Sequence, residues 1–216
     1  MGIVNSVLAI VVLTLFLQIT FRLLPAARPL PLVGIILTIL IGVPSLLQFL
    51  WPGIADALER NPQLTLNDGQ WWRIVTAVMA QDGGLVAAVF NLFVVALVTV
   101  LSEWIWGRWR TVVLFLVPSI ILNVLAIFWN QPGGGSSFAS DGLLMSICGW
   151  GFVVSGRRVI QWCAISAIAI GTFLVTIGDA HGVAMLLGAV VGIVLGFVDG
   201  ARSRRSGVST RSTTGE

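Results

Sequence analysis

The sequence predicts an all-α fold, a polytopic membrane bundle of seven hydrophobic helices, and three observations lead to it. Hydrophobic residues make up 57% of the 216 positions and charged residues only 10%, whereas a soluble domain carries about 25% charged residues. The mean hydropathy of +0.99 means that too little polar surface exists to cover a globule in water. Several separate stretches also approach the roughly 20 apolar residues that one membrane-spanning helix needs. We therefore expect an integral membrane protein embedded in a lipid bilayer.

The predicted spans follow one another with mostly short polar breaks. In chain order they cover residues 3–21, 30–51, 85–102, 111–129, 137–154, 159–177 and 183–198. The first could instead be a removable signal peptide, but no basic residue precedes its apolar run and its first arginine follows it. This pattern favours an uncleaved anchor. The chain then divides into an extra N-terminal helix and turn (1–29), a six-helix membrane domain (30–200) and a tail (201–216).

One break, between the second and third spans, is long enough to carry structure of its own. Residues 52–84 include Asp56 and Glu59 and are too polar to cross a membrane. The same stretch contains Trp71 and Trp72, which are too apolar for a free loop. We therefore expect a structured connector that lies in the membrane interface.

The arginines predict the orientation of the bundle. The chain has twelve arginines and no lysine, and ten of the twelve would lie on one side of the seven spans. Because basic residues concentrate on the cytoplasmic side, we expect the C-terminus in the cytoplasm and the N-terminus outside, as in a bacterial plasma membrane. The tail is predicted to be disordered and to lie beside anionic lipid. The pI of about 10.1 then reflects this topology, and no nucleic-acid partner is expected.

Most polar residues within the spans gather where the third, fifth and seventh spans enter from the outside. Polar side chains in lipid are costly, so their clustering at one depth indicates a site. They are Asp82, Asn91, Ser136, Ser137, Ser140, Asp141, Asp179 and His181. No metal or cofactor is expected, because one histidine and the separated Cys148 and Cys163 do not form a zinc site. Both cysteines lie in apolar runs, which indicates buried thiols rather than a bridge.

A serine and the only histidine are the candidate catalytic pair. His181 is the one side chain suited to proton transfer at neutral pH, although a lone interfacial histidine is often only hydrogen-bonded to a carbonyl. Ser137 follows a glycine run at the start of a span, where free N–H groups can hold an oxyanion, although such a serine is often only an N-cap. Small residues spaced four apart along the last span allow a close approach to its neighbour. They are Ala180, Ala184, Gly188, Gly192 and Gly196.

Five sequence blocks stand in order and at matching places in the predicted topology. They are residues 69–76 with the Trp72-Arg73 pair, Asn91, residues 103–107 with Glu103 and Gly107, Gly135-Ser136-Ser137 with Gly142, and Asp179-Ala180-His181 with Ala184 and Gly188. Together these blocks resemble the rhomboid family of intramembrane serine proteases. The resemblance implies a six-helix core preceded by one extra helix. It also implies a Ser-His dyad of Ser137 and His181, with Asn91, Gly135 and Ser136 around the oxyanion. The spacing to Gly142 favours Ser137 over Ser136 as the nucleophile. Trp72, Arg73, Glu103, Gly107 and Gly188 are expected to be structural.

The sequence departs from the family pattern at three positions. Phe138 replaces the glycine after the nucleophile, and Ala87 replaces a histidine that would donate to the oxyanion. Loss of one such donor typically costs about 100- to 1000-fold in rate. Asp141 stands where an aromatic residue commonly stacks on the histidine. It is one helical turn from Ser137 on the same face, so it could orient His181; the alternatives are a protonated carboxyl or one hydrated in a cavity open to the outside.

The expected function is therefore that of a serine endopeptidase that cleaves transmembrane segments of other membrane proteins near the outer face. One alternative is a catalytically inactive rhomboid-like protein that binds membrane-protein clients, which Phe138 and Ala87 favour and the retained Ser137 and His181 oppose. A second alternative is a small-solute transporter. A transporter would show internal repeats and helices broken near the midplane, whereas the polar residues here cluster at one depth.

Overall fold

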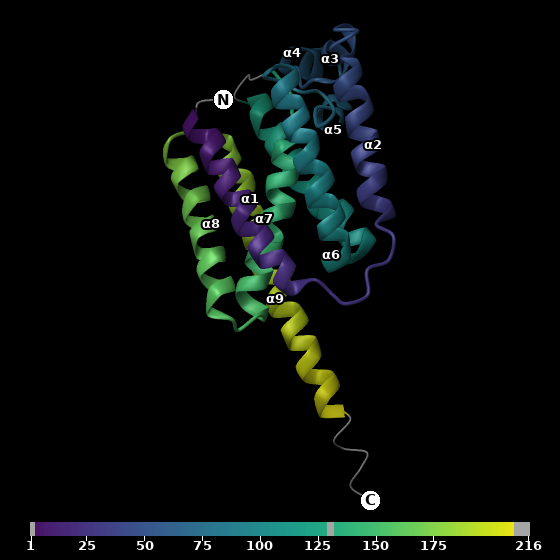
Figure 1. Cartoon of the computed structure of the whole chain (residues 1–216). Helices are drawn as coiled ribbons and strands as arrows, with labels where there is room; N and C mark the ends of the chain where they lie inside the picture. The colour runs from purple at the N-terminus through teal and green to yellow at the C-terminus, as the bar shows by residue number, and fades with distance from the viewer. Residues whose placement is uncertain (1–2, 129–131, 210–216) are drawn as a thin grey trace, which may run out of the picture.

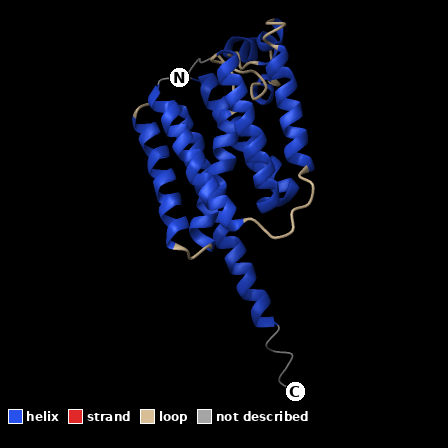
Figure 2. Ribbon diagram, in the orientation of Figure 1, coloured by secondary structure: helices blue, strands red, loops and turns tan. Residues whose placement is uncertain are grey.

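The computed structural model describes residues 3–128 and 132–209, and within these ranges the chain is helical and forms no strand (Figure 2). Helices of very different length alternate with short turns (Figure 1). They are α1 (Ile3–Leu23), α2 (Leu32–Leu47), α3 (Gly53–Leu58), α4 (Pro62–Asn67), α5 (Arg73–Thr76), α6 (Gly84–Phe128), α7 (Ser137–Val154), α8 (Arg158–Thr176) and α9 (Ala180–Ser209).

Five of the described helices, α1, α6, α7, α8 and α9, are long and apolar enough to cross a membrane. α2 is a shorter apolar helix of 16 residues. Many of their large hydrophobic side chains point away from the protein interior, as expected for helices that face lipid rather than water. The chain is thus an all-helical integral membrane protein.

α6 joins the predicted third and fourth spans into one element of 45 residues that is broken at Gly107. Gly107 has φ +73° and ψ 172°, a backbone conformation that glycine adopts without strain. The side chains of Asn91 and Asn123, on opposite sides of this break, both bond to residues of the 52–84 connector. The two arms of α6 therefore fold back on each other, with Gly107 at the far end. Trp129, the predicted end of the second arm, lies outside the described residues.

The connector is structured, as the sequence predicts, and consists of α3, α4 and α5 with their turns. Arg73 organises it from within and is only 6% exposed. Its guanidinium donates to the carbonyls of Asp56 (2.6 Å) and Glu59 (2.9 Å) and to the side-chain oxygen of Gln70 (2.7 Å). These bonds satisfy the buried charge. Trp72, beside it, is exposed.

The last helix is longer than the sequence predicts. α9 continues as far as Ser209, so the boundary expected at residue 200 is not where the helix ends. Helical structure thus enters the tail that was predicted to be disordered. The remaining tail residues, 210–216, lie outside the described residues.

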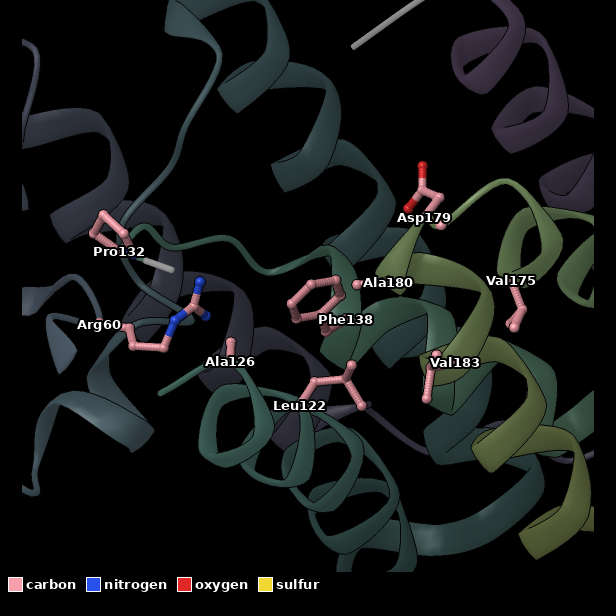
Figure 3. A pocket seen from close by; sticks show the side chains of 10 residues that line it. Arg60, Leu122, Ala126, Pro132, Phe138, Val175, Asp179, Ala180 and Val183 are labelled. Carbon is pink, nitrogen blue, oxygen red and sulfur yellow. The ribbon is translucent and has the colours of Figure 1, made fainter. Parts of the chain in front are cut away.

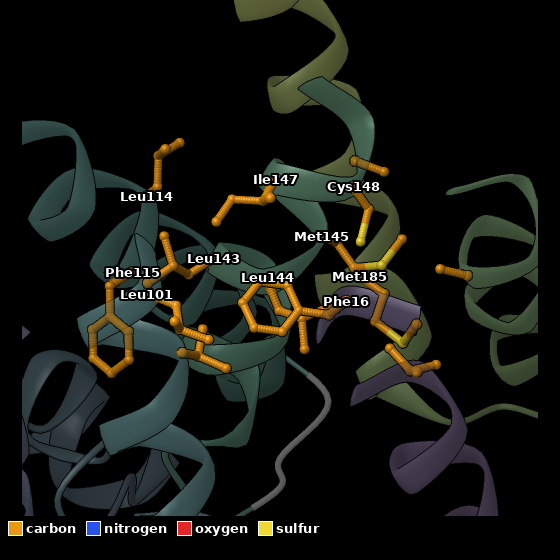
Figure 4. Packing of buried hydrophobic residues seen from close by; sticks show 14 of the residues in the cluster. Phe16, Leu101, Leu114, Phe115, Leu143, Leu144, Met145, Ile147, Cys148 and Met185 are labelled. Atoms are coloured by element: carbon orange, nitrogen blue, oxygen red, sulfur yellow. The ribbon is translucent and has the colours of Figure 1, made fainter. Parts of the chain in front are cut away.

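α7 lies at the centre of the bundle and is buried along most of its length. Its inward side chains, including Leu143, Leu144 and Met145, join residues of α1 and α6 in one hydrophobic core (Figure 4). Against α9 the backbones almost touch, because a Cβ added at Gly188 would lie 2.1 Å from the carbonyl oxygen of Gly142. This close approach holds the first turns of α7 and α9 side by side.

Candidate active site

Ser137 and His181, at the first turns of α7 and α9, meet within hydrogen-bonding distance. His181 Nε2 lies 2.9 Å from Ser137 Oγ. The neighbouring Ser136 is fully buried and bonds elsewhere, accepting a hydrogen bond from Gln81. Of the two adjacent serines, only Ser137 therefore presents its hydroxyl to the imidazole in this structure.

Asp179 completes a row of three groups. Its Oδ1 lies 2.6 Å from His181 Nδ1 and accepts the backbone N–H of His181 at 2.9 Å. The hydrogen bond from the imidazole, together with the backbone N–H, lowers the pKa of this carboxyl from its ordinary value near 3.8, against the opposing effect of burial. Asp179 is thus a carboxylate at neutral pH. A carboxylate can only accept, so Nδ1 carries the proton and Nε2 turns its lone pair toward the hydroxyl of Ser137.

The sequence offered Asp141 as one possible orienter of the histidine, but the carboxylate bonded to the ring is that of Asp179. No hydrogen bond joins Asp141 to His181 within the described part of the chain. The i, i+4 rule correctly places Asp141 one turn below Ser137. His181 Nδ1, however, faces the turn that precedes α9. This turn contains Asp179, two residues before His181.

Phe138 supplies an aromatic contact that the sequence did not predict. Its ring centroid lies 5.0 Å from that of His181, with the planes tilted by 58°, a favourable arrangement for an aromatic pair. The substitution noted as a departure therefore places a ring against the imidazole.

The glycine run before α7 fixes the position of Ser137 through backbone contacts with the connector. Gly133 exchanges two backbone hydrogen bonds with Arg60, and the N–H of Gly135 donates to the carbonyl of Ala77 at 2.9 Å. The N–H of Gly134 donates to the Asp82 carboxylate, also at 2.9 Å. A Cβ on Gly134 would lie 2.7 Å from the carbonyl oxygen of Ala77, so the close approach requires glycine there.

Behind the two serines lies a buried network of amides and hydroxyls that sequence reasoning missed. Gln81 is its hub: its Nε2 donates to the hydroxyls of Ser45 (3.2 Å) and Ser136 (3.1 Å), and its backbone exchanges two bonds with the side chain of Gln48. Asn91, predicted as an oxyanion donor, donates to Gln81 Oε1 at 3.1 Å. The only sequence signal was the presence of two glutamines next to apolar spans, which does not reveal that they meet.

Replacing Gln81 by leucine is expected to lower the free energy of unfolding by about 1–3 kcal/mol, the usual cost of leaving buried polar partners unsatisfied. Leucine has about the same volume as glutamine, but it cannot form the hydrogen bonds that Gln81 makes with Ser136 and Asn91. Reversible unfolding in mixed detergent micelles measures the change. Gln63→Leu, at an exposed position of α4, is the matched control and should change stability little; equal losses in both variants would contradict a structural role for the network.

A cavity of about 600 Å³ opens beside the Ser-His-Asp row (Figure 3). Its walls are mostly apolar, with the charged Asp179 and Arg60 at separate places on the lining. The lining residues are Arg60, Leu122, Ala126, Pro132, Phe138, Val175, Gly178, Asp179, Ala180 and Val183. Arg60 is held there by Asn123, whose side-chain oxygen accepts at 2.6 Å. The cavity has room for an apolar side chain.

The other predicted motif residues lie away from this site. Glu103 is buried near the break in α6, where it accepts the N–H of Gly34 at 2.8 Å and pairs with Arg108 at 3.5 Å. Gly107 forms the break itself, and Gly188 packs on α7 two turns below His181. The side chain of Ala87 is a methyl group, which cannot donate a hydrogen bond. The structure thus brings together Ser137, His181 and the Asn91–Ser136 network, and separates them from the remaining motifs.

Comparison with protein-family models yields no match, and comparison with curated proteins yields none either.

Proposed function

We propose that this protein is a rhomboid-type intramembrane serine endopeptidase that cleaves transmembrane segments of other membrane proteins near the outer face. The observation that carries the proposal is the row formed by Ser137 Oγ, the His181 ring and the Asp179 carboxylate, with separations of 2.9 and 2.6 Å. The same nucleophile–base–acid order is the working arrangement of serine hydrolases. The row lies at the connector end of a lipid-facing bundle, where water and a membrane-embedded peptide can both arrive.

The proposed reaction follows from the protonation states in this row. Ser137 Oγ attacks the carbonyl carbon of the scissile bond while His181 Nε2 takes the hydroxyl proton. The C–N bond then breaks, and the imidazolium returns that proton to the leaving amine. Water, deprotonated by the same nitrogen, hydrolyses the acyl–Ser137 ester. Asp179 keeps Nδ1 protonated and stabilises the imidazolium formed in each step.

The developing oxyanion would be held by the start of α7. The first N–H groups of an α-helix have no partner within the helix, and the positive end of the helix dipole favours an anion there. The side chain of Asn91, held by Gln81 at 3.1 Å, is the available amide donor from α6. This arrangement makes up for the absence of a donor at Ala87.

The number of membrane spans and their orientation are part of this proposal. Counting both arms of α6 and the shorter α2 gives seven spans, of which α1 is the extra one and the other six form a rhomboid-like core. The site then faces the outside, and the C-terminal end of α9 with its arginines faces the cytoplasm, in accord with the positive-inside rule.

Labelling with a fluorophosphonate tests the proposal, because only an activated serine displaces fluoride from phosphorus. The full-length protein in detergent should carry the adduct on Ser137, and both Ser137→Ala and His181→Ala should remove it. Ser6→Ala, at an exposed position of α1, serves as the matched control and should retain labelling. In proteoliposomes, a helix-destabilised transmembrane substrate should be cleaved by the wild type and not by Ser137→Ala. Substrate binding without labelling or cleavage would refute the protease and indicate a client-binding protein.

A further inference from the structure

The first helix reaches the candidate active site. α1 packs against α7 and α8, and near its start Asn5 donates its side-chain N–H to Asp179 Oδ2 at 2.5 Å. The other oxygen of the same carboxylate, Oδ1, accepts from the His181 ring and backbone. Both oxygens of the Asp179 carboxylate are therefore hydrogen-bonded. Oδ1 accepts from His181 at the start of α9, and Oδ2 accepts from Asn5, 174 positions away in the sequence.

The rest of α1 holds Asn5 rigidly in place. Val12, Phe16 and Ile19 are buried in the common core. Near the C-terminal end of α1, Ile19 and Leu23 pack closely against Gly151 of α7. A Cβ added at Gly151 would come within about 3.1 Å of either side chain. A helix anchored in this way cannot drift without breaking core contacts. An amide at the end of an apolar helix also needs a polar partner, and Asp179 is the partner it has.

We infer that Asn5 is a positioning residue, which acts on the reaction by fixing the carboxylate that orients His181. A carboxylate attached at one oxygen only can rotate about its Cβ–Cγ bond; the Asn5 bond to Oδ2 blocks that rotation and keeps Oδ1 aimed at Nδ1. The extra helix is then part of the catalytic unit. This inference rests on the proposed protease function and adds a role for α1.

The test compares variants of Asn5 that differ in their ability to donate a hydrogen bond to Asp179. Asn5→Ala should lower kcat about tenfold with little change in KM, the scale of one hydrogen bond to a charged group. Asn5→Asp, which keeps the shape but loses the amide donor and adds a like charge, should lower kcat further. Ser6→Ala, at the exposed neighbouring position, is the matched control and should behave as the wild type. A kcat for Asn5→Ala equal to that of the wild type, or a retained kcat for Asn5→Asp, would overturn the inference.

A double-variant cycle separates positioning from simple destabilisation. Measured as the rate of fluorophosphonate labelling of Ser137, the Asn5→Ala effect should vanish when Asp179 is already alanine, because the residue acts only through that carboxylate. An equal loss in both backgrounds would show that α1 supports the fold in general and would refute the inference. Failure of the protease proposal is distinguishable, since the wild type itself would then show no labelling of Ser137.

Discussion

Asp179→Asn is expected to lower kcat for cleavage by about 10⁴-fold, the loss typical of replacing a triad aspartate by its amide. An asparagine side chain can present its NH₂ group to Nδ1, which then has to act as the acceptor. The proton moves to Nε2, and the imidazole can no longer take the hydroxyl proton of Ser137, now 2.9 Å away. The labelling rate of Ser137 by a fluorophosphonate should fall in parallel.

Asp141→Asn is the matched comparison, since it makes the same chemical change at a carboxyl of α7 that is not bonded to the ring within the described residues. It should alter kcat far less than Asp179→Asn does. Turnover of a transmembrane substrate in proteoliposomes, with the amount of folded protein held equal, measures both variants. If Asp141→Asn proved the more damaging of the two, the assignment of the orienting carboxylate to Asp179 would be wrong.

Gly188→Ala is expected to destabilise the bundle by about 3 kcal/mol, at the upper end of the usual cost of overpacking. The added methyl group would meet the Gly142 carbonyl oxygen at 2.1 Å, where ordinary contacts begin near 3.4 Å. α7 and α9 would have to separate by about 1 Å, and a shift of that size at the reacting groups typically costs about 100-fold in rate. Both the unfolding midpoint and the labelling of Ser137 should fall.

Gly200→Ala provides the control on the same helix. Among the described residues, nothing beyond the surrounding helix backbone lies within 4 Å of a Cβ built at Gly200, and alanine favours helix over glycine by up to about 1 kcal/mol. This variant should therefore be as stable as the wild type or slightly more so. Stability losses of equal size at both positions would mean that the close contact between α7 and α9 is not what the small residues provide.

The sequence by itself determined the helical membrane class and much of the layout. Composition and apolar run length depend on no partner, and the predicted 137–154 span coincides with α7 (Ser137–Val154) because a glycine run ends just before it. Other ends were less accurate. The predicted spans 85–102 and 111–129 correspond to the two arms of α6, but hydropathy did not reveal that the break between them is as short as the single kink at Gly107.

Sequence reasoning also singled out Ser137 and His181, because a lone histidine and a glycine-led serine at one membrane depth are rare in so apolar a chain. The carboxylate it offered as a possible orienter of His181, however, was Asp141 rather than Asp179. Helical periodicity relates residues along one helix, and it placed Asp141 correctly under Ser137; the partner of Nδ1 depends on how the turn before α9 is folded. That turn places Asp179 2.6 Å from the ring.

Only the tertiary structure decided which distant residues complete the site. Asn5 meets Asp179 across 174 positions, and Gln81 gathers Ser45, Asn91 and Ser136 from three separate helices or their ends. Each of these side chains forms ordinary hydrogen bonds, which many other polar residues could also have accepted or donated. Burial and apolar spacing are properties of a segment, and they can be read from it alone. Hydrogen-bond partners are properties of the packed bundle, because close helix packing selects which polar groups come within bonding distance.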